Sequence, residues 1–155
     1  MKNITCCFTG HRAISNEMKI YLHARLESEI EKLINMGITR FCTGGALGFD
    51  TIAALSVIRK RMVYPHIKLI LILPCKEQSR GWSNTNKEIY EDILRCADEV
   101  TYVSEDYTRY CMMLRNRALV DASSVCICYM EKQSGGTAYT VNYAEKSGLE
   151  IINLI

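Results

Sequence analysis

The segment Lys68–Leu73 constrains the fold of this chain more than any other, because its sequence KLILIL is apolar at five consecutive positions. A strand with one face in water alternates apolar and polar residues, whereas an unbroken apolar run is typical of a strand covered on both faces. Such strands occur in parallel sheets, where each crossover helix packs on one face. The segment therefore predicts an α/β domain with helices on both sides of a central sheet.

The rest of the chain alternates short apolar runs with longer helical patterns. Between positions 16 and 36, apolar residues recur every three or four positions, which is helical spacing, and Gly37 is placed to end that helix. A capping box, Thr85-x-x-Glu88, precedes a later helical pattern. We expect strands at 4–8, 40–43, 68–73, 99–104, 125–129 and 149–154, and helices at 16–36, about 50–63, 85–97, 107–122 and 136–147.

This alternation requires parallel pairing with right-handed crossovers. We therefore predict an open, doubly wound, mostly parallel sheet flanked by helices, which is a Rossmann-like architecture. The 155 residues contain no linker, repeat or low-complexity segment. That length fits a single domain, residues 1–155, on the usual prior of about 100–200 residues per domain.

The charge balance argues against a nucleic-acid partner. Nineteen Lys and Arg residues against seventeen Asp and Glu give a formal net charge of +2, and no basic block stands out. No run of eighteen apolar residues is present, and the N-terminal apolar stretch is too short for a signal peptide. We expect a cytoplasmic protein with no membrane partner.

The eight cysteines are expected to be reduced thiols. No pair has the C-x-x-C spacing of a zinc or redox site, and five of the cysteines fall inside strand-like apolar runs. A free thiol in such a run behaves as a small hydrophobic group. The three histidines are scattered and form no ligand pair, so we expect no metal site and predict no certain cofactor.

Three glycine-containing turns are the strongest functional feature. They are TGHR (9–12) after the first strand, TGGALGFD (43–50) after the second and SGGT (134–137) after the fifth. In an open α/β sheet all of these turns share the edge where ligands bind. Glycine lets backbone N–H groups approach a ligand, and the helix that follows adds about half a positive charge, which suits a phosphate. The sequence lacks both G-x-G-x-x-G and the P-loop, so ordinary dehydrogenase and ATPase functions are disfavoured.

The candidate ligand-binding residues follow from these turns and from one helix. Arg12 is placed either to pair with a phosphate or to pair with a helix acid on the surface. Asp50 is placed either to accept hydrogen bonds from a ribose or to act as an ordinary acid at a helix start. One polar residue of 115–117 must face inward if its apolar neighbours pack. The full candidate set is Thr9, Gly10, Arg12, Gly44, Gly45, Gly48, Asp50, Arg115, Asn116, Gly135, Gly136 and Thr137.

Two further features leave alternatives open. Trp82, the only tryptophan, lies near Gln78 in an irregular segment, where it is either a lid anchor or a stacking platform for a base. Tyr102, Tyr107 and Tyr110 mark either a homo-oligomer interface or a cover of the sheet edge.

The spaced motifs together resemble the YpsA-like family. The resemblance rests on TGHR, on TGGALGFD, on Gln78 with Trp82, on Arg115-Asn116 and on SGGTAYT, and it covers essentially the whole chain. That family belongs to the SMF/DprA–LOG (SLOG) superfamily of Rossmann-like nucleotide-binding domains. The superfamily also includes Lonely Guy phosphoribohydrolases, single-strand DNA-binding DprA proteins and sensors of ADP-ribose derivatives, and its members commonly form oligomers.

The resemblance implies roles for particular residues. The stretch from Gly44 to Asp50 is similar to the glycine-rich phosphate loop of DprA, and Met112-x-x-Arg115 is similar to a Lonely Guy motif whose arginine serves the active site. A one-residue slip that aligns Thr140 places Asn142 at the position of the Lonely Guy catalytic glutamate. An amide cannot exchange a proton as a general acid or base.

The leading hypothesis is therefore a sensor or regulator that binds a nucleotide or an ADP-ribose-like ligand, with no catalytic residue assigned. The first alternative is hydrolysis of a nucleotide N-glycosidic bond by a carboxylate that replaces the missing glutamate. The second is DprA-like binding of single-stranded DNA, which the near-neutral charge opposes because such sites combine a positive groove with aromatic platforms.

Overall fold

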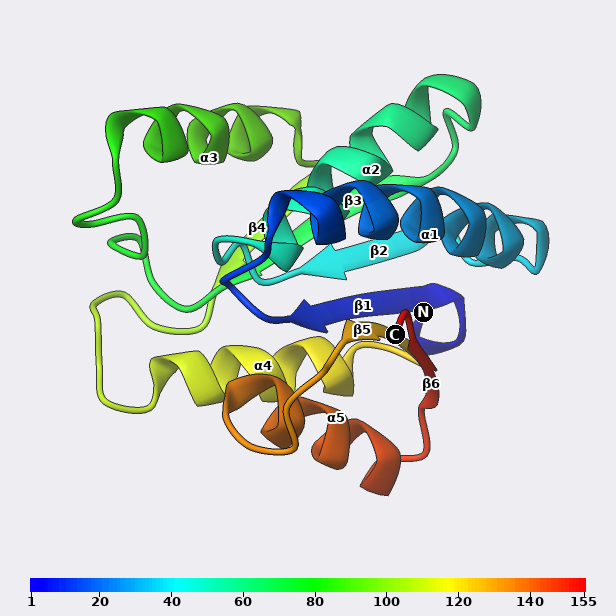
Figure 1. Cartoon of the computed structure of the whole chain (residues 1–155). Coiled ribbons are helices and arrows are strands. Elements are labelled where there is room, and N and C mark those ends of the chain that lie inside the picture. The colour runs from blue at the N-terminus through cyan, green and yellow to red at the C-terminus, as the bar shows by residue number, and fades with distance from the viewer.

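Strands and helices alternate along the whole chain in the computed structural model, which describes residues 1–155 (Figure 1). A short 3-10 turn, η1, spans Lys2–Ile4. None of the helices combines the length and the apolar character that crossing a membrane requires. The bounds in chain order are β1 Thr5–Gly10, α1 Asn16–Asn35, β2 Arg40–Thr43, α2 Phe49–Val63, β3 Lys68–Leu73, α3 Asn84–Cys96, β4 Glu99–Tyr102, α4 Cys111–Asp121, β5 Val125–Tyr129, α5 Gly136–Lys146 and β6 Glu150–Asn153.

The six strands form one sheet in the order β4-β3-β2-β1-β5-β6, and every neighbouring pair is parallel. From β1 to β4 the sheet grows in one direction, and the chain then returns so that β5 pairs with the free side of β1. The order reverses between β1 and β5, and in open α/β sheets such a switch point is where ligands bind. The predicted Rossmann-like fold class is confirmed.

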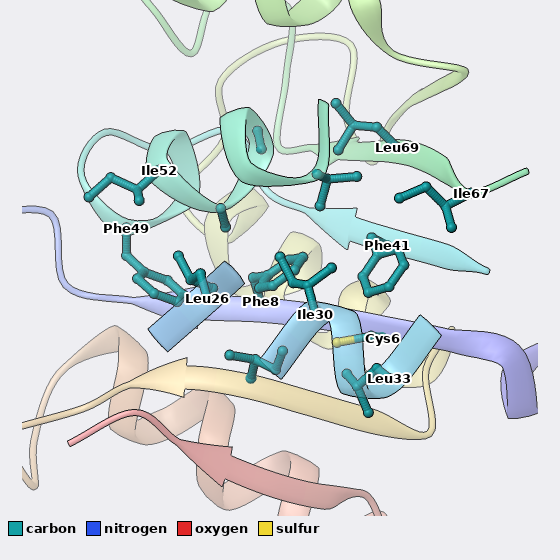
Figure 2. Packing of buried hydrophobic residues seen from close by; sticks show 14 of the residues in the cluster. Cys6, Phe8, Leu26, Ile30, Leu33, Phe41, Phe49, Ile52, Ile67 and Leu69 are labelled. Atoms are coloured by element: carbon teal, nitrogen blue, oxygen red, sulfur yellow. The ribbon is translucent and has the colours of Figure 1, made fainter. Parts of the chain in front are cut away.

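Helices cover both faces of the sheet, as the apolar run in β3 predicts. Leu69 and Leu71 belong to the larger core cluster, together with residues of α1, α2 and α3. Ile70 and Ile72 belong to the smaller cluster on the opposite face, together with residues of α4 and α5. Figure 2 shows the larger cluster, in which the Phe8 side chain of β1 lies between those of Phe41 and Phe49. Its ring centroid is 6.2 Å from that of Phe41 and 6.4 Å from that of Phe49.

Two helix starts differ from the sequence-based expectation. The N-cap of α3 is Ser83, whose Oγ accepts the Asn86 N–H at 3.2 Å, so Thr85 lies inside the first turn and caps nothing. Helix α4 begins at Cys111, four residues after the predicted start. Tyr107 and Tyr110 are three positions apart, which is helical spacing, but both lie in the loop before α4. They are 64% and 55% exposed, so they do not form the buried side of a helix.

Seven of the eight cysteines are buried and free, and Cys96 at the end of α3 is exposed. The burial predicted for the strand cysteines is confirmed. Burial raises the pKa of Cys42 and of Cys128 to about 12, because the thiolate loses its hydration. These thiols pack as apolar side chains and are poor nucleophiles.

We predict that the native protein reacts rapidly with a thiol-specific chromogenic disulfide at Cys96 alone. The other thiols are excluded from solvent, so they react only when the fold opens. Stopped-flow labelling should give one fast equivalent in buffer and eight in denaturant. A Cys96→Ser control should lose the fast phase, and several fast equivalents in the native protein would contradict the packing.

Candidate ligand-binding site

A cavity of about 350 Å³ lies at the sheet edge where the order of strands reverses. It opens between the end of β1, the start of α4 and the loop that leads from β5 into α5. Small-molecule sites typically occupy about 300–1,000 Å³. The lining residues are Thr9, Gly10, His11, Arg12, Ala46, Asp50, Met112, Arg115, Asn116, Lys132, Ser134, Gly135, Gly136 and Thr137.

The structure brings most of the predicted candidates together in this cavity. From the candidate set, Thr9, Gly10, Arg12, Asp50, Arg115, Asn116, Gly135, Gly136 and Thr137 are lining residues. Five lining residues were not in the candidate set, although all but Lys132 lie inside turns or motifs that the sequence had pointed to: His11, Ala46, Met112, Lys132 and Ser134. Lys132 had no recognisable signal, because its place depends on the course of the β5–α5 loop.

The glycines of the second turn do not line the cavity, because the turn packs inward. A side chain at Gly44 would collide with the Arg115 guanidinium, and one at Gly45 would collide with Leu73. Gly48 has a φ of +80°, and a Cβ there would lie 2.2 Å from the carbonyl oxygen of Arg12. These glycines let the turn pack closely against α4, β3 and the first turn, which is a different role from the predicted phosphate contact.

Close packing also joins the first turn to the start of α2. A Cβ at Gly10 would lie 2.5 Å from the ring of Phe49, and the Phe49 N–H donates to the His11 carbonyl at 3.1 Å. The β1–α1 and β2–α2 turns therefore form one packed unit beneath the cavity. This unit fixes Arg12 and Asp50 relative to each other.

Arg115 is the central residue of the site. It lies in the second turn of α4 and is only 5% exposed. Its guanidinium donates to the Gly44 carbonyl, to Gln78 Oε1 at 3.3 Å and to Asn116 Oδ1 at 2.8 Å, and its Nη2 faces the Met112 sulfur at 3.6 Å. Burial lowers the Arg115 pKa, while the charge of Asp50 acts in the opposite direction. All the groups that accept hydrogen bonds from Arg115 are neutral: a backbone carbonyl, two side-chain amides and a thioether sulfur.

Asp50 lies in the first turn of α2 and is 6% exposed. Its Oδ2 accepts the Ala46 N–H at 3.1 Å, which closes the β2–α2 turn. Burial raises the Asp50 pKa above its ordinary value of 3.8, and this effect exceeds the opposing effects of Arg115, the Ala46 N–H and Arg12. Asp50 is the only carboxylate among the lining residues.

The N-terminus of α5 contributes backbone donors to the cavity. Its N-cap is Gly135, at φ +96°, and no side chain caps the helix. A helix start without a side-chain cap leaves its first N–H groups free, and the helix dipole adds positive potential there. A Cβ at Gly136 would meet no atom within 4 Å, so this wall of the cavity is open.

The cavity carries an excess of positive charge. Arg12, Arg115 and Lys132 line it, and none of them forms an ion pair within 4.0 Å, whereas nine such pairs lie elsewhere on the molecule. Asp50 offsets one of the three charges. The arrangement fits an anion, because the buried Arg115 needs a countercharge and the exposed Arg12 and Lys132 add positive potential around the same cavity.

Gln78 and Trp82 lie behind the site and not in it. Gln78 is buried and donates to the Gly44 carbonyl and to the Tyr90 hydroxyl, each at 3.3 Å, while its Oε1 accepts from Arg115. Trp82 packs edge-on against Tyr90, with ring centroids 5.2 Å apart. The lid-anchor alternative for Trp82 agrees with this packing better than a stacking platform does.

Asn142 does not lie in the cavity. It is exposed on α5, whereas Thr137 is the buried residue of that helix that lines the site. A linear alignment cannot show which side of a short helix faces the ligand. Asn142 is therefore no guide to whether a catalytic group is present.

A single parallel sheet with a ligand-sized cavity at its switch point defines an open, Rossmann-like α/β domain. Residues 6–151 match the YspA SLOG family, and the chain belongs to that family. The SPbeta prophage-derived protein YoqJ of Bacillus subtilis is 33% identical over 149 residues, covering 88% of this chain and 87% of the relative. UPF0398 protein BH1768 of Halalkalibacterium halodurans is 32% identical over 140 residues, covering 88% of this chain and 71% of the relative.

Solved structures share the fold at low sequence identity. DNA processing protein A (DprA) of Streptococcus pneumoniae superposes with a TM-score of 0.70 at 16% identity, covering 97% of this chain and 50% of DprA. The Helicobacter pylori protein, whose structure concerns single-stranded DNA binding, gives 0.69 at 18% identity, covering 97% of this chain and 64% of its own. Protein TM1055 gives 0.58 at 15% identity, covering 95% of this chain and 71% of its own.

We predict that Asp50→Asn stabilises the protein relative to wild type in a pH-dependent way. Because the folded pKa of Asp50 is raised, its carboxyl ionises first in the unfolded chain, and the fold loses stability as the pH rises from 3.8 through the folded pKa. The amide does not titrate and keeps an acceptor for the Ala46 N–H.

Urea unfolding at pH 3.5, 5 and 7 tests this. The difference in free energy of unfolding between Asp50→Asn and wild type should shift in favour of the variant with pH and then level off. The control is Asp106→Asn, in an exposed loop, which should show no such trend. A difference in free energy of unfolding that is constant with pH would contradict the raised pKa of Asp50 in the folded protein.

Proposed function

We propose that this chain binds a nucleotide or an ADP-ribose-like ligand in the cavity at the switch point, with a phosphate group beside Arg115. The observation that carries the proposal is that Arg115 is buried, charged and bonded only to neutral groups. A buried guanidinium with no carboxylate among its hydrogen-bond partners is costly, and the buried Asp50, whose own pKa is raised, compensates it only in part. A phosphate in the adjoining cavity supplies the remaining negative charge, and Nη2, which has only the Met112 sulfur as a partner, is the guanidinium nitrogen placed to bond to it.

The composition of the wall supports recognition of phosphate and sugar. Only two of the fourteen lining residues are hydrophobic, Ala46 and Met112, and the wall contains no phenylalanine, tyrosine or tryptophan ring. Hydroxyl, amide and backbone groups prevail, and Asp50 is placed to accept from ribose hydroxyls. A base therefore has no large aromatic ring to stack on in the wall, so most of the binding energy is expected from the phosphate and the ribose.

The SLOG membership of the chain is consistent with this proposal, because the superfamily includes sensors of ADP-ribose derivatives. A role as a sensor or regulator requires binding without turnover. A cytoplasmic location fits a chain with eight free cysteines, since disulfides form and persist mainly in oxidising compartments.

A thermal-shift titration with AMP, NAD, ADP-ribose and cyclic nucleotides tests the proposal. A ligand present at a hundred times its dissociation constant stabilises the fold by about 2.7 kcal/mol. For a chain of this size, that corresponds to a rise in the unfolding midpoint of about 5–10 °C. We predict such a rise for at least one ligand, and we predict that Arg115→Ala abolishes it.

Arg117→Ala is the matched control. Arg117 lies two residues further along α4, is exposed, and contacts Tyr139 and Tyr143 outside the cavity. Its removal changes the net charge by the same amount and should leave the ligand-induced shift intact. A shift that survives in Arg115→Ala, or a flat response across the panel, would refute the proposal.

A second candidate function, hydrolysis of an N-glycosidic bond, is favoured by Asp50. It is the one carboxylate in the wall, and its raised pKa suits a general acid better than that of an exposed aspartate does. If this function is present, the protein releases free base from a nucleoside monophosphate, and Asp50→Asn lowers the rate by a factor of about 100 or more. Chromatographic detection of the base measures it. A rate unchanged in Asp50→Asn or in Arg115→Ala would identify a contaminant.

Single-stranded DNA binding is the third candidate, supported only by the fold shared with the DprA structures. A labelled oligonucleotide tested at two salt concentrations distinguishes it. Contact with several phosphates requires affinity to fall steeply with salt. A small ligand held in this cavity by one or two phosphate groups predicts a shallower dependence.

A further inference from the structure

His11 connects two turns that are far apart in the sequence. It lies in the β1–α1 turn, and its Nε2 accepts the Glu131 N–H at 2.9 Å and the Lys132 N–H at 3.4 Å from the β5–α5 loop. Its ring packs edge-on against Tyr129, with centroids 5.1 Å apart. A nitrogen that accepts two N–H groups carries no proton, so the neutral ring carries its proton on Nδ1.

These bonds hold a segment that otherwise has little support. Residues 131–136 are exposed, and no other hydrogen bond ties residues 131–135 to a distant part of the chain. The same segment supplies Lys132, Ser134 and Gly135 to the cavity wall and leads directly into the N-terminus of α5. The shape of this wall therefore depends on His11.

We propose that His11 is a positioning residue and a proton switch for the ligand site: the neutral ring holds the β5–α5 loop in its binding shape, and the protonated ring releases it. This inference rests on the proposed function, because the regulated event is ligand binding in the same cavity. Protonation at Nε2 would place a donor against two N–H donors and would remove both bonds.

The groups around the ring determine the direction of the switch. Tyr129, Glu131 and Lys132 face it from β5 and the following loop, and Arg12 lies beside it in its own turn. Partial burial and the Lys132 charge lower the His11 pKa from 6.5, and Glu131 acts in the opposite direction. The loop contacts are therefore complete above pH 6.5 and are lost as the pH falls through the lower folded pKa.

A bound anion has the opposite effect, because its charge attracts a proton to His11. Two bonds are lost on protonation, and the new imidazolium would lie beside Lys132 and Arg12. We expect these losses to prevail, so that acidification weakens binding.

The first test follows the free protein by nuclear magnetic resonance between pH 5 and 8. We expect ring nitrogen shifts that show a proton on Nδ1 at pH 8. Exchange of the Glu131 and Lys132 amide protons, corrected for the intrinsic effect of pH, should rise about tenfold as His11 titrates. His11→Gln, whose side-chain oxygen replaces the acceptor without titrating, should show no such rise, and His66→Gln should behave as wild type. A proton on Nε2, or amide exchange that is independent of His11 ionisation, would overturn the proposal that His11 holds the β5–α5 loop.

The second test compares ADP-ribose affinity at pH 7.5 and 5.5. This probe suits the test because its diphosphate diester keeps the same charge over that range. Wild type should bind about tenfold more weakly at pH 5.5, His11→Gln should bind equally at both, and His11→Ala should bind weakly at both. Equal or tighter wild-type binding at pH 5.5 would overturn the switch. Absence of ADP-ribose binding by every protein at both pH values counts against the proposed ligand class, and the resonance experiment then still decides the role of His11.

Discussion

The arrangement of this molecule depends on one constraint, which is that all six strands run parallel. Because each strand ends at the same edge, each turn from a strand into a helix is brought to that edge as well. The return of the chain from β4 to β5 then separates the turns on the two sides of β1 and leaves a cavity between them. Without parallel pairing, Arg12, Asp50 and Lys132 would not lie around one cavity.

The glycines at this edge of the sheet lie in two different surroundings. Gly10 and Gly48 let the first two turns contact each other through Phe49 and the Arg12 backbone. Gly135 and Gly136 lie in open space at the start of α5. The first pair builds a rigid support, and the second pair leaves room for a ligand. A side chain at Gly10 or Gly48 is expected to disturb folding, because it would collide with neighbouring atoms. A side chain at Gly136 is expected to leave the fold intact and to obstruct the proposed ligand.

The burial of Arg115 is unfavourable for stability and therefore informative about function. Gln78 and the Gly44 carbonyl orient the guanidinium but do not neutralise it. Replacing buried charged groups by apolar side chains often stabilises a protein, and this is why the proposed phosphate site is placed at Arg115. Asp50 fits the same description, since its burial opposes its ionised form.

Much of this could be predicted from the sequence, but not all of it. The apolar run at 69–73 requires cover on both faces, which determines the fold class, and turns after parallel strands must share an edge. The inward packing of Gly44, Gly45 and Gly48 was not predictable, because glycine is equally compatible with a ligand contact and with a close loop contact. The roles of Lys132 and His11 depend on the path of the β5–α5 loop, which no local pattern specifies.

A crystal structure of the protein with ADP-ribose is the most direct test of a phosphate site at Arg115. We predict a phosphate group within hydrogen-bond distance of the Arg115 guanidinium and of the backbone N–H groups at the start of α5, with the ribose toward Asp50. Density for the ligand at any other place, or in the cavity with its phosphates directed away from Arg115, would contradict it.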